Sequence, residues 1–231
     1  MAGPASSASG RIPSFVHHRT RLTEGQQHAW DRWWPVYGGE VPEVSRVQQL
    51  FERGAPLVLE IGSGNGEATT RMAAAAPETD LLAVEVYEPG LAHTLIRMRE
   101  AELTNVRLLR GDAVDLLERA VPERSLDGIR VFFPDPWPKR RHHKRRLVQP
   151  AFAALAASRL KPGGYLHLAT DWAHYAAQMR EVADACPALH RDERTGADGW
   201  LPRPDHRPLT KFEQRAVQEG REVRDLLYRS R

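Results

Sequence analysis

The chain has 231 residues, and its 33 basic and 30 acidic side chains give a formal net charge of +3. This length suits one domain with a sizeable core, and the single cysteine, Cys186, excludes an intrachain disulfide and a cysteine zinc cluster. The lone cysteine favours a reducing, cytoplasmic setting, and no apolar run approaches the roughly 18 residues of a membrane span. The ten histidines show no ligand-like spacing, so no metal site is expected.

The predicted elements begin with a tail, because residues 1–10 are small and polar and are expected to be disordered. Residues 11–56 are expected to form an extension packed on the core, with one short helix at 43–53. From residue 57 onward, short apolar runs alternate with helical patterns. The predicted strands are 57–61, 81–86, 106–109, 126–133, 165–169 and 222–228, and the predicted helices are 67–76, 91–103, 114–119, 147–160, 172–186 and 210–219. Strands and helices that alternate in this way predict an α/β fold with a doubly wound, mostly parallel sheet.

A glycine turn follows the first predicted strand, in the segment Glu60-Ile61-Gly62-Ser63-Gly64-Asn65-Gly66. Glycines at a strand-to-helix turn let a ligand approach the backbone closely, although a tight turn alone would also use them. The G-x-G-x-G spacing differs from the dinucleotide fingerprint, and no lysine of the phosphate-binding type follows. The turn therefore disfavours a nicotinamide dehydrogenase and a phosphoryl-transfer enzyme.

Acidic residues end the next two predicted strands. Glu85 closes the second strand and Asp112 follows the third, at the strand ends where open α/β sheets bind ligands. A carboxylate at the first place suits the two hydroxyls of a ribose, and one at the second suits an adenine amine. Taken singly, each acid is also explained as a solvated loop residue or a helix cap.

The fourth predicted strand runs into Pro134-Asp135-Pro136-Trp137. The Asp135 carboxylate suits the N1–H and N2–H₂ edge of a guanine, and the two prolines stiffen the loop; the alternative is a capped turn. Trp137 suits stacking on a base or filling the core equally well.

Charge is concentrated directly after this loop. Residues 139–146 hold six basic side chains and no acidic one, whereas residues 57–138 hold 14 acidic and 8 basic side chains. Such a density suits contact with phosphates; a solvated loop and a nuclear localisation signal are the alternatives.

The glycine turn and the strand-end acids resemble those of class I S-adenosylmethionine-dependent methyltransferases over residues 57–170. The Pro-Asp-Pro-Trp segment followed by the basic run makes the likeness specific, and the chain resembles bacterial tRNA (guanine-N7)-methyltransferases. Three further stretches agree with that family: Ala169–Trp172, Thr210–Glu213, and Ser14–Val16 with Arg19, Arg21, Gly25 and Gln26. The sequence departs from the family pattern in the Gly-Ser-Gly-Asn-Gly turn and at Pro138.

The resemblance implies a Rossmann-like class I methyltransferase domain over residues 57–231 that uses S-adenosylmethionine and methylates N7 of a guanine in the variable loop of tRNA. The protein is expected to be a monomer or a homodimer. It implies that Asp135 is catalytic and that the cofactor is bound by Glu60, Gly62, Gly64, Glu85, Asp112 and Asp135. It implies that substrate is bound by Lys139, Asp171, Thr210, Lys211, Phe212 and Glu213, and that RNA contacts Arg141, His142, His143, Lys144, Arg145 and Arg146.

Alternatives remain at both levels. Asp171 also suits a helix N-cap, and Lys211 with Glu213 also suits an exposed ion pair. For the whole chain, the rival functions are a class I methyltransferase acting on a small molecule or protein and a non-catalytic RNA-binding subunit with the same fold. The basic run disfavours the first rival, and the intact acids Glu60, Glu85, Asp112 and Asp135 disfavour the second.

Overall fold

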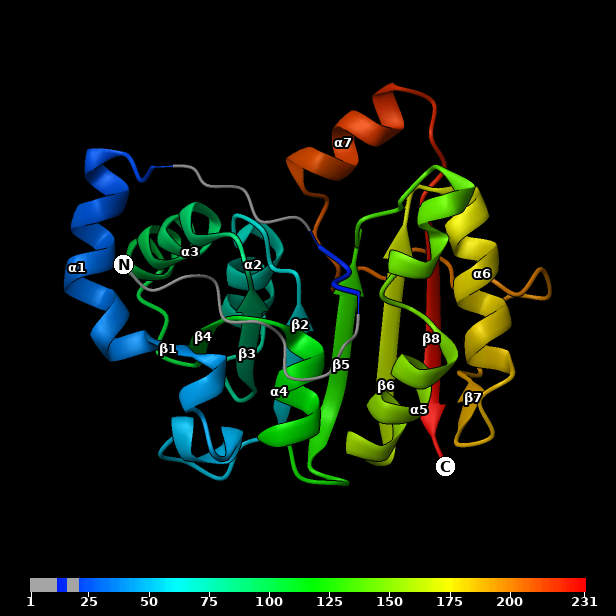
Figure 1. Ribbon diagram of the computed structural model, residues 1–231, viewed down its shortest axis with the longest axis horizontal. Coiled ribbons are helices and arrows are strands. Elements are labelled where there is room, and N and C mark those ends of the chain that lie inside the picture. The colour runs from blue at the N-terminus through cyan, green and yellow to red at the C-terminus, as the bar shows by residue number, and fades with distance from the viewer. Residues whose placement is uncertain (1–11, 16–20) are drawn as a thin grey trace.

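The computed structural model describes residues 12–15 and 21–231, so the predicted tail at 1–10 lies outside the described residues, as do Val16 and Arg19. The strands are β1 (Gly38–Glu40), β2 (Leu57–Ile61), β3 (Asp80–Glu85), β4 (Val106–Arg110), β5 (Leu126–Phe132), β6 (Leu160–Thr170), β7 (Leu189–Arg191) and β8 (Arg224–Ser230). Within the described residues they form one eight-stranded sheet in the order β1-β4-β3-β2-β5-β6-β8-β7 (Figure 1). The pairs from β1 to β6 are parallel, and β8 runs antiparallel to both β6 and β7. The predicted doubly wound, mostly parallel α/β fold is confirmed.

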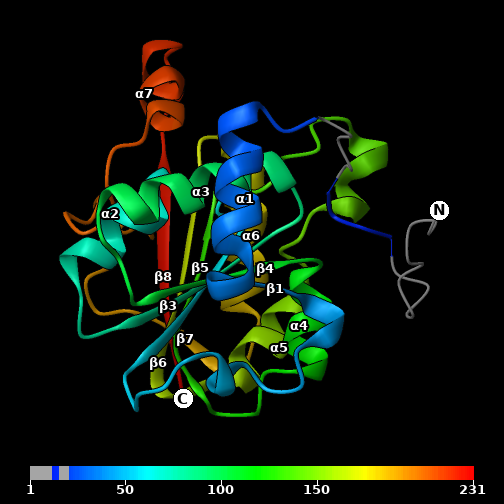
Figure 2. The ribbon, with the colours of Figure 1, turned by 90° about the vertical axis from the view of Figure 1, so that its left-hand side faces the viewer.

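Helices cover both faces of this sheet. They are α1 (Glu24–Tyr37), α2 (Glu67–Ala75), α3 (Glu88–Glu100), α4 (Ala113–Arg119), α5 (Pro150–Arg159), α6 (Ala173–Asp184) and α7 (Lys211–Gln218), with 3-10 turns η1 (Val41–Glu43), η2 (Val47–Leu50) and η3 (Arg140–Arg145). One buried cluster joins the sheet to α2 and α3, and a larger one joins it to α4, α5 and α6 on the opposite face (Figure 2). All residues of β2 are buried, as expected for a central parallel strand covered on both faces.

The helix predicted at 43–53 is wrong, because the chain forms the two 3-10 turns η1 and η2 there. Val47 is fully buried, and its backbone N–H donates to the carbonyl of Ala120 at 3.0 Å. That bond to the end of α4 replaces one that a continuous helix would have made within itself.

Three elements were not predicted: α1, β1 and β7. Two signals mark α1. Thr23 and Gln26 form a reciprocal capping box at its start, and Trp30, Trp33, Trp34 and Tyr37 recur at helical spacing. This aromatic face packs on the cluster around α3. The β1 strand that follows pairs with β4, so the N-terminal extension adds a strand to the sheet.

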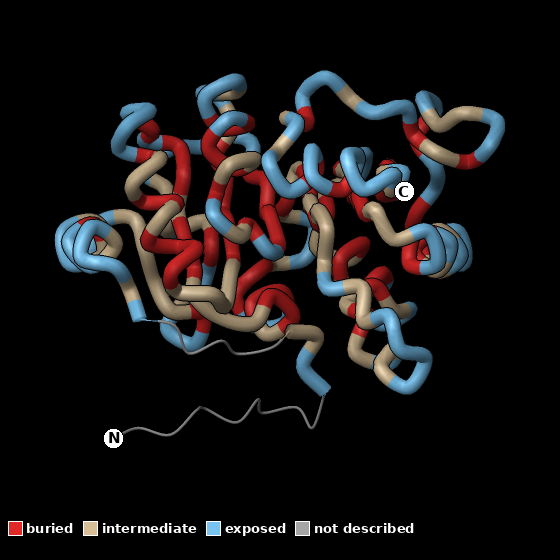
Figure 3. Tube along the Cα trace, turned by 90° about the horizontal axis from the view of Figure 1, so that it is seen from above, coloured by how far each residue is buried: buried red, intermediate tan, exposed pale blue. Residues whose placement is uncertain are grey.

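The strand order changes direction between β2 and β5. The chain proceeds outward from β2 to β3 and β4 on one side, and from β5 to β6 on the other. Ligands of open α/β sheets bind at such a switch point, beyond the carboxyl ends of the strands. Helix α7 lies above this edge (Figure 1), and seen from above most of its residues are exposed (Figure 3).

Candidate active site

A pocket of about 310 Å³ lies at the switch point. Its lining comes from the ends of β2, β3, β4 and β5 and from the N-terminal segment, and includes Ser14, Phe15, Gly62, Gly64, Glu85, Asp112, Phe133 and Asp135. The volume lies within the roughly 300–1,000 Å³ of small-molecule sites. The strand ends therefore bring together five of the six residues predicted to bind the cofactor.

The glycine turn leaves one wall of the pocket open. Gly62 and Gly64 have φ values of +79° and +54°, a left-handed conformation that side chains rarely adopt. A Cβ atom built at either position meets nothing within 4 Å. The backbone at the turn is therefore accessible from the pocket, as close binding of an extended ligand requires.

Glu85 is held rigidly at the pocket wall. Its Oε2 accepts a hydrogen bond from the Gly64 N–H at 2.9 Å, and its Oε1 accepts from the N–H groups of Val86 at 2.7 Å and Tyr87 at 3.0 Å. These bonds use three of the roughly four acceptor positions of a carboxylate. Glu85 thus ties the glycine turn to the end of β3 while it lines the pocket.

Asp112 has two roles in the structure. It is the N-cap of α4, where its Oδ1 accepts a hydrogen bond from the Val114 N–H at 2.8 Å, and it also lines the pocket. The helix-cap alternative is thus confirmed for this residue. Asp112 lines the pocket even though it caps the helix.

Glu60 lies beneath the glycine turn and not in the pocket lining, because its side chain is buried in the interior of β2. Its Oε2 has no hydrogen-bond partner among the described residues. Burial raises the pKa of Glu60, and Thr69 and Arg130 offset only part of that effect.

The Asp135 loop is bounded by two unusual residues. Phe133 and Trp137 have φ values of +53° and +44°, which non-glycine residues adopt at a cost of order 1–3 kcal/mol. Trp137 is half-buried: its indole N–H donates to the Ser14 carbonyl at 2.9 Å, and the Arg145 guanidinium lies 3.8 Å from its ring centre. Contacts outside the loop therefore hold it in a conformation that its backbone disfavours.

The basic segment 139–146 divides by exposure. Lys139, Arg140, Arg141 and Lys144 are exposed, and His142, His143 and Arg145 are half-buried. Arg145 donates to the carbonyls of Pro13 at 3.3 Å and Phe15 at 3.2 Å. Arg146 differs from all of them because it is only 2% exposed.

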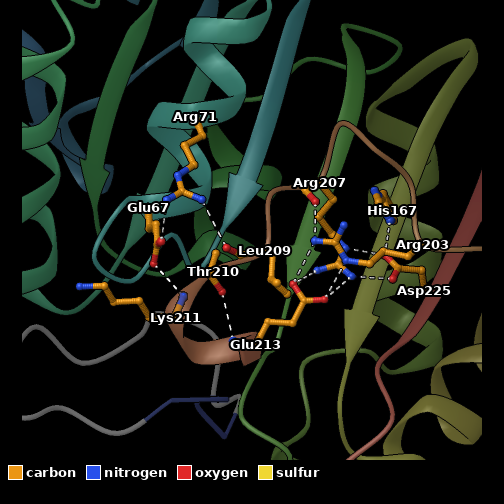
Figure 4. A network of polar contacts seen from close by, with 10 residues as sticks. All are labelled: Glu67, Arg71, His167, Arg203, Arg207, Leu209, Thr210, Lys211, Glu213 and Asp225. Atoms are coloured by element: carbon orange, nitrogen blue, oxygen red, sulfur yellow. Dashed lines mark hydrogen bonds and ion pairs between the residues drawn. The ribbon is translucent and has the colours of Figure 1, made fainter. Parts of the chain in front are cut away.

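Helix α7 is tied to the start of α2. The Lys211 backbone N–H donates to Glu67 Oε2 at 3.0 Å, and Arg71 donates to the Leu209 carbonyl at 3.3 Å (Figure 4). On the other side, the Phe212 ring lies 5.2 Å from the ring of Phe133, which lines the pocket. Of the Thr210–Glu213 motif, Phe212 therefore contacts a residue of the pocket lining.

Glu213 is buried in an ion-pair cluster and not in an exposed pair with Lys211. Arg207 donates to both Glu213 oxygens at 2.7 and 2.9 Å and to both Asp225 oxygens at 2.8 Å (Figure 4). Arg203 adds a bond to Glu213 at 3.1 Å, and His167 contacts Asp225 at 2.8 Å. The side chains of Arg207, Glu213 and Asp225 are each 1% exposed.

The helix N-cap alternative for Asp171 is wrong. The N-cap of α6 is Trp172, and Asp171 Oδ2 accepts from Arg221 Nε at 2.7 Å.

Among the described residues, no group of three His, Cys, Asp or Glu side chains is placed to hold a metal ion. No helix in the described parts of the chain has the length and apolar character needed to span a bilayer.

Comparisons with known proteins agree with this geometry. A family model described as "Putative methyltransferase" matches residues 54–226. The tRNA (guanine-N(7)-)-methyltransferase of Halorhodospira halophila is 51% identical over 220 residues, covering 94% of each chain. That of Alkalilimnicola ehrlichii is 47% identical over 236 residues, covering all of this chain and 98% of the other. The chain belongs to the bacterial tRNA (guanine-N7)-methyltransferase family.

Solved structures agree on the fold of this methyltransferase. TrmN from Thermus thermophilus superposes with a TM-score of 0.54 at 20% identity, covering 78% of this chain and 45% of that one. The 16S rRNA methyltransferase KamB gives 0.53 at 15% identity, covering 79% and 91%. At such identities the likeness concerns the fold, and it supports the predicted class I architecture.

Three residues near the site of this methyltransferase were not predicted from the sequence. Arg207 and Asp225 anchor α7, and Tyr175 packs against Arg146, which was predicted only as an RNA contact. A lone arginine in a polar loop predicts a solvated surface, so nothing local marked Arg207. Asp225 carried a weak signal, since it lies two residues before Leu227 on the same face of a buried strand.

Proposed function

We propose that this methyltransferase transfers the methyl group of S-adenosylmethionine to N7 of a guanine in the variable loop of tRNA. The observation that carries the proposal is that the pocket and the exposed basic residues adjoin each other. Asp135 lies in a pocket with Glu85 and Asp112, and the exposed cations Lys139, Arg141 and Lys144 follow it directly in the chain. The relatives named above, which match nearly the whole chain, bear the name of that activity. We expect the chain to act in the cytoplasm, as a monomer or homodimer.

The lining of the pocket suits the chemistry of the cofactor. The open backbone at Gly62 and Gly64 suits the methionine part, Glu85 suits the ribose hydroxyls, and Asp112 suits the adenine amine. When bound, S-adenosylmethionine supplies a methyl group carried on a positively charged sulfur. The acids around the pocket match that charge.

Asp135 orients the target base in this proposal. Its carboxylate accepts hydrogen bonds from the N1–H and N2–H₂ groups of guanine, a donor pair that adenine lacks. N7 of guanine carries a lone pair and no proton, so its methylation requires no general base. The chain has to place the base and to stabilise the positive charge that the base gains, and a rigid loop with a carboxylate does both.

The test is incubation of the protein with labelled S-adenosylmethionine and bulk tRNA, followed by nucleoside analysis for 7-methylguanosine. Asp135→Asn keeps the shape of the side chain but loses the charge and one acceptor. We expect its rate to fall by roughly 100–1,000-fold. Asp205→Asn is the matched control, because Asp205 is exposed in the loop before α7 and should tolerate the same change.

Two outcomes would contradict the proposal at different levels. A wild-type protein that makes no 7-methylguanosine would refute the activity. An Asp135→Asn variant that turns over at a near-normal rate would leave the activity standing and refute the role of Asp135.

A further inference from the structure

The basic segment 139–146 contains one member that does not face solvent. Arg146 is 2% exposed, whereas Arg141 and Lys144 are exposed. The N–H of Arg146 donates to the His143 carbonyl at 3.0 Å, which closes the last turn of η3. The side chain then lies toward the first turns of α6, where Tyr175 packs under it with the ring centre 4.8 Å from the guanidinium. A phosphate cannot reach a guanidinium buried in this way without rearrangement of the segment.

The guanidinium of Arg146 joins the Asp135 loop to α6. Its Nε donates to the Pro136 carbonyl at 2.8 Å, one residue beyond Asp135. Its Nη1 donates to Gln178 Oε1 at 2.6 Å and lies 3.0 Å from His174 Nδ1, which must be unprotonated to accept from an arginine. Gln178 in turn donates to the Val148 carbonyl at 3.2 Å, so its amide is oriented from both ends.

Burying the Arg146 guanidinium without a carboxylate partner costs free energy, so the arrangement calls for an explanation. Among the described residues, the hydrogen-bond partners of the Arg146 side chain are a carbonyl, an amide and an imidazole, and its Nη2 is buried with no partner. Burial lowers the pKa of Arg146, and only the influence of Tyr175 opposes it. A buried charge without a carboxylate is rare, and departures from good packing chemistry concentrate at functional sites.

We infer that Arg146 is a positioning residue that holds the Pro134–Trp137 loop, and through it Asp135, in its place at the pocket. This inference rests on the proposed function, and it assigns Arg146 to the reaction centre and not to RNA contact. The loop needs such an anchor because Phe133, the residue before it, and Trp137, its last residue, both have left-handed backbone conformations. Removing the bond to the Pro136 carbonyl frees the loop to relax away from the pocket.

The experiment separates turnover from RNA affinity in the full-length protein. Arg146→Met, Arg141→Met and Arg119→Met each remove one positive charge; Arg119 is exposed at the end of α4, away from the pocket, and is the control. For each variant, single-turnover rates are measured at saturating tRNA, and tRNA affinity is measured over a range of salt concentrations. Circular dichroism and thermal melting establish that each variant is folded.

We expect Arg146→Met to lower the rate at saturating tRNA by roughly 10–100-fold, because small misplacements of a reacting group have effects of that size. Its tRNA affinity and the slope of log affinity against log salt should match those of the wild type. Arg141→Met should instead weaken binding and flatten that slope by roughly 0.7–0.9. Arg119→Met should change neither quantity.

Two further variants keep the inference testable if Arg146→Met does not fold. Gln178→Leu removes a neutral partner of the guanidinium without altering the charge of the RNA-facing surface, and it should lower the turnover rate with an unchanged salt slope. Arg146→Lys retains the charge but not the fork that reaches the Pro136 carbonyl and Gln178 together, and it should restore only part of the rate.

The inference would be overturned if Arg146→Met kept a normal turnover rate. If Arg146→Met does not fold, it would be overturned if the single variants Arg146→Lys and Gln178→Leu both kept a normal rate. It would equally be overturned if Arg146→Met flattened the salt slope as Arg141→Met does, since that result would make Arg146 an RNA contact. Failure of the proposed function is a distinct result, because the wild-type protein would then produce no 7-methylguanosine at all.

Discussion

Two arginines near the pocket, Arg146 and Arg207, are buried, and their partners differ in charge. Arg207, under α7, bonds to two carboxylates, Glu213 and Asp225. Arg146, under the Asp135 loop, bonds to neutral groups. Burial alone lowers the pKa of either guanidinium. At Arg207 the bonds to Glu213 and the charge of Asp225 outweigh burial and raise the pKa, whereas at Arg146 it stays lowered.

The difference indicates two ways of attaching a peripheral segment to the sheet. Helix α7 buries only Glu213 and Ala216, so its attachment depends on the ion-pair cluster and on a few contacts at its start. The Asp135 loop is attached at its middle by one cation that binds a backbone carbonyl. We therefore expect the Arg207 cluster to affect mainly stability and Arg146 to affect mainly turnover.

The largest expected effect on stability is at Arg207. Arg207→Met leaves Glu213 and Asp225 buried without their shared partner, and breaking a buried ion pair from one side typically costs about 3–5 kcal/mol. Urea denaturation measures the free energy of unfolding of the variant against the wild type. A loss below about 1 kcal/mol would show that the cluster does not anchor α7.

A smaller loss is expected for Arg146→Met in the same measurement. This change leaves the Pro136 carbonyl and the Gln178 amide without a donor, at about 1–3 kcal/mol, but it leaves no buried carboxylate unpaired. If Arg146→Met destabilised the protein as much as Arg207→Met does, the proposed difference between the two arginines would be wrong.

The smallest expected effect concerns pH and His167. Burial lowers the pKa of this fully buried ring below its ordinary value of 6.5, and its contact with Asp225 offsets only part of that shift. The unfolded chain therefore binds a proton at a higher pH than the folded protein. The stability that His167 contributes is complete above pH 6.5 and is lost as the pH falls below it, by at most about 1.4 kcal/mol per pH unit.

A variant isolates this contribution. His167→Gln does not titrate but retains an N–H donor for Asp225, so its stability should fall less steeply between pH 6.5 and 5. Some dependence should remain, because burial and the charges of His167 and Arg130 lower the pKa of the neighbouring His206 to about 4. Asp225 does not interfere in this range, because the His167 bond and the Arg207 charge outweigh its burial and keep its pKa below 3.8. An equally steep profile in the variant would exclude His167 as the source.

The central part of the fold was predictable because its signals are local. The strand at Leu57–Ile61 was predicted with its observed bounds, since an apolar run ends at a glycine turn. Helix α1 also carried local signals, in its capping box and its aromatic spacing. The turns at Val41–Leu50 were not predictable in this way, because the backbone of Val47 bonds to Ala120, more than 70 residues away.

By itself, the sequence determined the class of fold and the family, and it placed the pocket-lining acids at the ends of successive strands, which converge at the switch point of a doubly wound sheet. It showed the six cations of 139–146 as one basic run, and it predicted Glu213 as a substrate-binding residue with an exposed ion pair as the alternative. Only the tertiary structure separated them. The turn of η3 and the packing of Tyr175 direct Arg146 inward, and the β8 strand supplies Asp225 beneath α7. Whether a charge contacts solvent or the core depends on which distant element packs against it.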